Sequence, residues 1–90
     1  MFHLEWQDLA TSELAKGWLQ ADTQLRADIT AAVYEIERRL LHAPDRVGES
    51  RNPGTRVLVL YPLTITFHVN IRTNTALISA VRVYRRRGKQ

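Results

Sequence analysis

One apolar stripe on a predicted helix limits most strongly what this chain can fold into. Between residues 25 and 40, apolar side chains recur at positions i, i+4, i+7, i+8, i+11 and i+15: Leu25, Ile29, Ala32, Val33, Ile36 and Leu40. This spacing places them on one continuous face of a helix. Asp22 or Thr23 can cap its start, and Pro44 ends it. A helix with a single apolar face must be covered by another element, so the chain has to supply a second layer.

The second half of the chain supplies that layer as three strand-like runs, residues 55–61, 63–70 and 75–84. The middle run alternates, with apolar residues at every odd position from Leu63 to Val69 and polar residues between them. This period of two predicts a strand with one buried and one open face. The pair Tyr61-Pro62 and the segment 72–74 mark the two reversals between the runs.

Two further elements precede the long helix. Residues 2–6 alternate as a short half-buried strand, and helical spacing follows from Leu9 to Leu19. Gly17 lowers the stability of that helix by about 1 kcal/mol relative to Ala. Residues 45–54 contain Gly and Pro and are predicted to form a loop.

The predicted fold is therefore α+β, with the order β-α-α-β-β-β and a helical hairpin packed on a mostly antiparallel four-stranded sheet. Ninety residues make one domain, 1–90, because two cores would not fit. Residues 85–90 are predicted to form a flexible basic tail, since nothing apolar follows Tyr84.

The charge of the two halves differs in sign. Residues 1–45 hold four Lys or Arg and eight Asp or Glu, whereas residues 46–90 hold nine Lys or Arg and one acid, Glu49. The excess is densest at the end, around Tyr84 and Arg85. Clustered guanidinium groups repel one another, so we expect an anionic partner, with nucleic acid as the first candidate. The acids of the first strand and the helices are interpreted as solvated: Glu5, Asp8, Glu13, Asp28, Glu35 and Glu37.

Several classes of protein are disfavoured by what the sequence lacks. There is no cysteine, and the three histidines are scattered, so we expect no disulfide framework, no metal site and no cofactor. The longest nearly apolar run, 57–63, is far too short to span a membrane. The first residues do not have the pattern of a signal peptide, and a cytoplasmic protein is expected.

The ordered set of elements and motifs resembles the RelE/ParE superfamily of toxins from type II toxin–antitoxin modules. The resemblance rests on the opening strand with Trp6, the two helices, and the segments 47–51, 54–58, 63–69 and 78–86. It implies an antitoxin protein as partner. RelE-like members cut mRNA in the ribosomal A site, whereas ParE-like members inhibit DNA gyrase. A third outcome is a non-catalytic member that only binds its antitoxin.

The resemblance also implies candidate site residues. Arg56, Arg82 and Tyr84 are the candidate catalytic residues, and Arg56 and Arg82 are expected to flank one groove if their strands share a sheet. The candidate RNA-binding residues are Arg51, His68, Arg85, Arg86 and Arg87. The chain departs from many RelE-like nucleases at Thr64, in a region where they carry an arginine.

The chemistry fits these residue types. In metal-independent RNA cleavage the 2′-hydroxyl attacks the adjacent phosphate, which requires a proton acceptor, cations for the charge on phosphorus and a donor for the leaving 5′-oxygen. Arginine binds phosphate oxygens with two parallel hydrogen bonds and stays charged. Tyr84 can stack on a base or transfer a proton. The structural alternatives are a tyrosine that packs at a strand end and solvated arginines, with Arg51 paired to Glu49.

Overall fold

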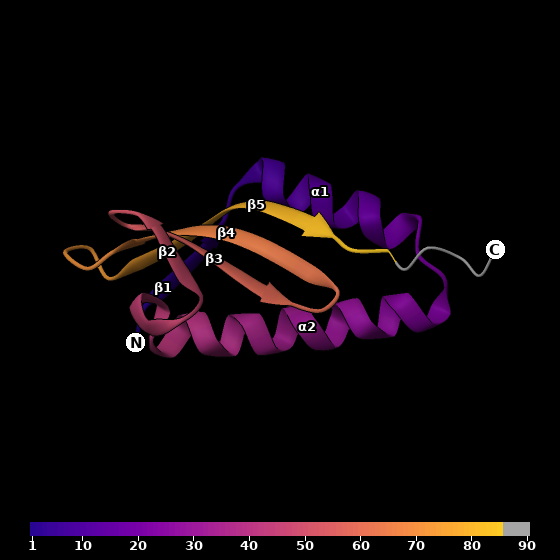
Figure 1. Ribbon diagram of the computed structural model, residues 1–90, viewed down its shortest axis with the longest axis horizontal. Helices are drawn as coiled ribbons and strands as arrows, with labels where there is room; N and C mark the ends of the chain where they lie inside the picture. The colour runs from indigo at the N-terminus through magenta and orange to yellow at the C-terminus, as the bar shows by residue number, and fades with distance from the viewer. Residues whose placement is uncertain (86–90) are drawn as a thin grey trace.

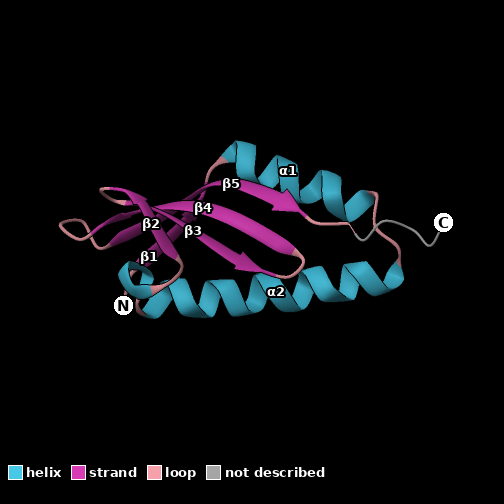
Figure 2. Cartoon of the chain, viewed as in Figure 1, coloured by secondary structure: helices cyan, strands magenta, loops and turns pink. Residues whose placement is uncertain are grey.

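The computed structural model describes residues 1–85 and contains two α-helices, a short 3-10 helix and five strands (Figure 1, Figure 2). In chain order they are β1 (His3–Trp6), α1 (Asp8–Leu19), α2 (Thr23–His42), η1 (Pro44–Arg46), β2 (Glu49–Asn52), β3 (Thr55–Leu60), β4 (Leu63–Asn70) and β5 (Thr75–Val83). Of the predicted tail at 85–90, only Arg85 belongs to the described residues. None of the helices among these residues is long and apolar enough to cross a membrane.

The five strands form one sheet in the order β1-β5-β4-β3-β2. The β1–β5 pair is parallel and the other three pairs are antiparallel. The α+β class and the helical hairpin on one sheet are confirmed, but the prediction of four strands was one strand short. The missing strand, β2, lies in the segment predicted as a loop. Its four residues are polar and exposed, so backbone pairing at an edge forms it without any hydrophobic pattern.

The core lies between the helices and one face of the sheet. The odd-numbered residues Leu63, Ile65 and Phe67 of β4 are almost fully buried, together with Ile78 and Val81 of β5. Helix α2 covers them with the predicted stripe, of which Ile29, Ala32, Ile36 and Leu40 are buried. Figure 1 shows α1 beside β5 at the top of the view and α2 along the bottom of the view. The opposite face of the sheet is not covered by either helix; we call it the open face.

Local geometry fixes the ends of the elements. The carboxylate of Asp22 accepts a hydrogen bond of 2.8 Å from the backbone N–H of Leu25, so Asp22 is the N-cap of α2. The turn between β4 and β5 contains Asn74 with a φ of 58°, a left-handed conformation that Asn tolerates well. The backbone N–H of Tyr84 donates a 2.6 Å hydrogen bond to the carbonyl of Pro62, which holds the end of β5 to the β3–β4 turn.

Candidate functional site

Strand register decides which side chains share the open face. Thr64 pairs with Arg82, Thr66 with Ala80, and His68 with Leu77. Residues directly opposite each other in an antiparallel pair project from the same face. The open face therefore carries Arg82 and His68 together. They lie two rows apart, because Thr64 and His68 are four residues apart along β4, roughly 13 Å at about 3.3 Å per residue.

A hollow of about 500 Å³ lies on this face beside helix α1. Its walls are formed by Glu13 of α1, Thr64 and Thr66 of β4, and the segment 80–82 of β5. It thus brings together one carboxylate, one guanidinium and two hydroxyl groups. This set can bind a phosphate through cation and hydroxyl donors, and it contains a group that can accept a proton.

Arg82 has no hydrogen-bond or ion-pair partner among the described residues, and its side chain is exposed. The other two strand arginines are engaged. Arg51 forms an exposed ion pair with Glu49, at 3.3 Å between Nη1 and Oε1. Arg56 donates to backbone carbonyls of the preceding loop. Among the strand arginines that the structure describes, Arg82 is therefore the one whose guanidinium is available to bind an external anion.

The expected groove between Arg56 and Arg82 is not formed, and that prediction was wrong. Both strands belong to one sheet, but Arg56 pairs with the buried Phe67 and so projects from the helix-covered face. Its Nε donates to the carbonyl of Val47 at 2.7 Å and its Nη2 to that of Gly48 at 3.0 Å. In this arrangement Arg56 fixes the loop between η1 and β2, on the opposite side of the sheet from the hollow.

Tyr84 lies past the end of β5 and packs edge-to-face on Tyr61, with 5.9 Å between the ring centroids. Both rings are at least half exposed. The structure therefore agrees with the alternative of a packed strand-end tyrosine and also leaves the ring accessible from solvent. Since Tyr84 follows Arg82 by two residues, it continues the same side of the chain beyond the hollow.

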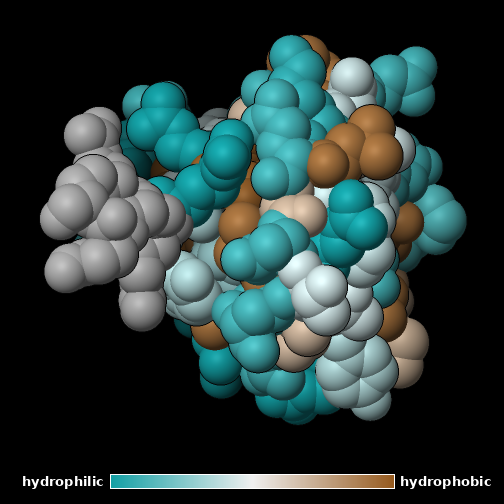
Figure 3. Space-filling view, turned by 90° about the vertical axis from the view of Figure 1, so that its right-hand side faces the viewer, coloured by the Kyte–Doolittle hydropathy of each residue, from teal (hydrophilic) through white to brown (hydrophobic). Residues whose placement is uncertain are grey.

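Arg85 is held at the same end of the molecule, where its Nη1 donates to Oε1 of Gln20 at 3.0 Å. Its neighbours in a second hollow of about 500 Å³ include Asp22 and Asp28, whose charges disfavour a phosphate there. Figure 3 views this end of the molecule, where hydrophilic side chains surround smaller hydrophobic areas. Arg86 and Arg87, the remaining predicted contacts of the tail, lie outside the described residues.

His68 is engaged through both ring nitrogens. Nδ1 lies 3.0 Å from Oγ1 of Thr55, and Nε2 lies 3.1 Å from Oγ of Ser79. Ser79 is the extra residue of a bulge in β5, and its hydroxyl also lies 3.3 Å from the carbonyl of Thr66. These contacts link three strands across the open face. The predicted RNA-binding role of His68 stays a prediction, with the ring already fixed by its neighbours.

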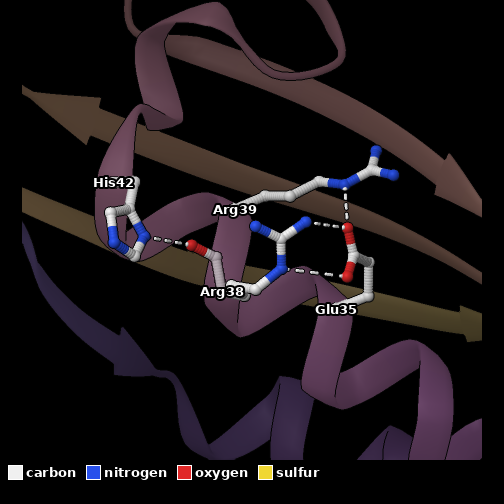
Figure 4. A network of polar contacts seen from close by, with 4 residues as sticks. All are labelled: Glu35, Arg38, Arg39 and His42. Atoms are coloured by element: carbon white, nitrogen blue, oxygen red, sulfur yellow. Dashed lines mark hydrogen bonds and ion pairs between the residues drawn. The ribbon is translucent and has the colours of Figure 1, made fainter.

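The acids of the helical layer are more engaged than predicted. Glu35 accepts hydrogen bonds from Arg38, at 2.6 and 3.1 Å, and from Arg39, at 2.7 Å (Figure 4). The hydrogen bonds from Arg38 and then from Arg39 lower the pKa of Glu35 from 4.5 to about 2. Glu37 accepts a 3.0 Å bond from the indole of Trp6. Arg38 and Arg39 thus share the single negative charge of Glu35, which offsets part of the positive charge of α2.

Glu13 is the site residue that the sequence interpretation missed, because it was assigned to a solvated face. Strand β1 pairs only with residues 75–78 of β5, so the outer edge of β5 beyond them has no strand partner. The carboxylate of Glu13 accepts a 2.8 Å hydrogen bond from the N–H of Val81 at that edge. One signal was present in the sequence: Gly17 follows Glu13 by one helical turn, and a glycine inside a helix lowers helix stability, which is consistent with a packing role on that face.

No group of three or more potential metal ligands occurs within residues 1–85. No protein-family model matches the sequence, and no curated protein matches it. Solved structures do match. A chain of the chromosomal ParDE toxin–antitoxin system of P. aeruginosa is 20% identical, with a TM-score of 0.66 over 94% of this chain and 98% of that one.

The chain has the RelE/ParE toxin fold. A chain of the RelBE2 toxin–antitoxin complex of Mycobacterium tuberculosis gives a TM-score of 0.70 at 19% identity, over 91% of this chain and 96% of that one. The isolated E. coli RelE toxin gives 0.62 at 13% identity, over 97% of this chain and 88% of that one. The fold implied by the resemblance is therefore confirmed. The TM-scores of the ParDE, RelBE2 and RelE structures differ little, at 0.66, 0.70 and 0.62.

Proposed function

We propose that this protein is the toxin of a type II toxin–antitoxin module and that it cuts mRNA on the ribosome. The observation that carries the proposal is the hollow on the open face, where Arg82 has no partner among the described residues and stands beside two threonine hydroxyls. The RelE/ParE fold supports the toxin role, since the solved structures that share it are toxins of such modules or their complexes.

In this proposal Arg82 binds the phosphate at the cut site, whose bond from phosphorus to the 5′-oxygen of the following nucleotide is broken. Its guanidinium stabilises the negative charge that develops on the non-bridging oxygens during attack of the 2′-hydroxyl. Thr64 and Thr66 donate hydrogen bonds to the same phosphate. The exposed phenol of Tyr84 donates a proton to the leaving 5′-oxygen or stacks on the neighbouring base.

Toeprinting on translating ribosomes tests the proposal. The wild-type protein is expected to produce cuts in the A-site codon, and Arg82→Ala together with Tyr84→Phe is expected to reduce them by about 10²–10⁴-fold, the usual size of losing charge stabilisation and acid–base catalysis. Arg46→Ala is the matched control, because that exposed arginine lies in η1 and not in the wall of the hollow. Uncut mRNA with the wild-type protein, or unchanged cutting by the double variant, would sink the proposal.

Inhibition of DNA gyrase is the second candidate, favoured by Thr64 at the place where many RelE-like nucleases carry an arginine and by the similarity to the ParDE structure. Supercoiling and DNA-cleavage assays separate the two functions. Only the gyrase function produces trapped gyrase–DNA complexes. If the protein neither cuts mRNA nor traps gyrase and does not arrest growth on expression, the non-catalytic alternative is left.

An antitoxin protein is the proposed partner. Helices α1 and α2 leave an apolar groove of about 460 Å³ between them, lined by residues that include Leu14, Trp18 and Val33. A groove of this kind can bury the apolar side of an amphipathic segment. Co-expression with the product of an adjacent reading frame, followed by co-purification, checks the partner; a neighbour that neither binds nor neutralises the protein would argue against it.

A further inference from the structure

The proposed cleavage lacks one component, the group that removes the proton from the 2′-hydroxyl. Arg82 cannot accept a proton, and a threonine hydroxyl is far too weak a base. His68 lies on the same face but roughly 13 Å from the Arg82 row, by about 3.3 Å per strand residue, and both its ring nitrogens have partners. Among residues 1–85, Glu13 supplies the only carboxylate in the wall of the hollow.

The placement of Glu13 suits this task. Its Oε1 is fixed by the 2.8 Å hydrogen bond from the N–H of Val81, and the side chain is partly buried. Its Oε2 accepts no hydrogen bond from any residue within the described range. No ion pair within 4.0 Å joins Glu13 to Arg82 in that range, so neither charge is neutralised by the other. One oxygen therefore orients the carboxylate, and the second is left for a substrate.

We propose that Glu13 is the general base of this site, a role that rests on the proposed cleavage of RNA. The carboxylate takes the proton of the 2′-hydroxyl, and the 2′-oxygen forms a bond to phosphorus. The bond from phosphorus to the 5′-oxygen breaks, and the 5′-oxygen takes a proton from Tyr84 or from water. The products are a 2′,3′-cyclic phosphate and a 5′-hydroxyl. Glu13 returns its proton to solvent, and Tyr84, where it is the donor, takes a proton back from solvent.

Glu13→Gln separates this role from a structural one. The amide oxygen of Gln can still accept the hydrogen bond from Val81, so folding stability is expected to stay at the wild-type level, but an amide does not accept the proton. Cleavage at the A site is expected to fall by about 10²–10⁴-fold, the usual contribution of general acid–base catalysis. Glu13→Ala loses both roles and is expected to lower the melting temperature as well.

Binding is measured in parallel, with ribosomes programmed by an mRNA that carries a 2′-deoxy nucleotide at the cut site. Glu13→Gln is expected to bind them as well as the wild type does, because it removes a negative charge near the phosphate. Glu5→Gln is the matched control: Glu5 lies on the open face, opposite Leu77, and is paired with His3 away from the hollow. That variant is expected to cut at the wild-type rate.

The outcomes distinguish the two proposals. If the wild type cuts and Glu13→Gln cuts equally well, the role of Glu13 is overturned and the proposed function stands. Loss of cutting by Glu13→Gln that is accompanied by loss of ribosome binding or of folding also overturns it, because the residue then acts in structure. If the wild-type protein leaves the mRNA uncut, the proposed function is overturned and the role of Glu13 with it.

Discussion

Gly17 lies where helix α1 packs closely against strand β5. It is buried, and a Cβ atom added to it would lie 2.9 Å from Cβ of Val83 and closer still to one of its methyl groups. In the middle of a helix, glycine is less favourable than alanine by about 1 kcal/mol. The close contact explains why it is present: a smaller helix-to-strand distance brings the Glu13 carboxylate, one turn earlier, within reach of the Val81 N–H.

Gly17→Ala is therefore expected to destabilise the protein although it improves helix propensity. Overpacking in a filled site costs about 1–3 kcal/mol, which outweighs the gain of about 1 kcal/mol in propensity. Urea denaturation measures the change. In a Val83→Ala background the same substitution is expected to cost less, because the clashing methyl groups are gone and only the contact with the Cβ of residue 83 is left. Stabilisation of the otherwise unaltered protein by Gly17→Ala would contradict the close packing.

Helix α2 ends in a network that gives its stability a dependence on pH. Glu35 has a pKa of about 2 in the folded protein, against an ordinary value of 4.5, because Arg38 and then Arg39 donate hydrogen bonds to its carboxylate (Figure 4). A lowered folded-state pKa contributes stability that is fully present above the unfolded value and is lost as the pH falls toward the folded value. The contribution of Glu35 therefore decreases between about pH 4.5 and about pH 2.

The free energy of unfolding of the wild type and of Glu35→Gln, measured at a series of pH values, checks this. The difference between the two proteins is expected to be constant above about pH 5 and to shrink as the solution becomes more acidic. Glu49→Gln is a suitable control, because that carboxylate has a single exposed partner, Arg51. A difference that stays constant down to pH 3, or grows there, would show that the pairing of Glu35 does not lower its pKa.

The elements differ in how far their sequences predicted them, and the reason is packing. Strand β4 and helix α2 have one buried and one open face, so their periodicity reveals both the structure and the buried side. Strand β2 buries nothing and is formed by pairing with β3, a contact that its sequence does not encode. The sheet face on which Arg56 lies was mispredicted. The pattern within one strand does not determine its register with the next strand, and this register places Arg56 opposite the buried Phe67.

The candidate site was predictable only in part, for a related reason. Arg82 could be predicted because it stands in the segment 78–86, which carries part of the resemblance and the basic ending. Glu13 could not be distinguished by its own position on α1 from a solvated acid, since its role depends on an edge of β5 that β1 leaves unpaired beyond residue 78. Contacts between elements that are 68 residues apart in the chain are visible only in the folded molecule.

At the scale of the whole molecule, the fold separates the two signs of charge into layers. The helical layer carries most of the acids, and two of its arginines are held by Glu35. The half of the chain that holds β2 to β5, residues 46–90 (the sheet half), has one acid and nine Lys or Arg, so the excess of positive charge lies in this half. An anionic polymer is therefore expected to approach the sheet from its open side, and its affinity is expected to depend on salt.

The salt dependence of RNA binding tests this separation of charge between the sheet half and the helical layer. Replacing Arg51 of β2, Arg72 of the β4–β5 turn and Arg82 of β5 by Gln removes three positive charges from the sheet half and keeps the length of the chain. For single-stranded RNA, each neutralised phosphate contributes about 0.7 to the slope of log K against log salt, so the slope is expected to become shallower by up to about 2. Fluorescence anisotropy with a labelled single-stranded RNA at several salt concentrations measures it. Replacing Lys16, Arg38 and Arg39 by Gln removes equal charge from the helical layer and is expected to leave the slope nearly unchanged. The opposite pattern, with only the helical replacements lowering the slope, would place the RNA on the helices and not on the sheet.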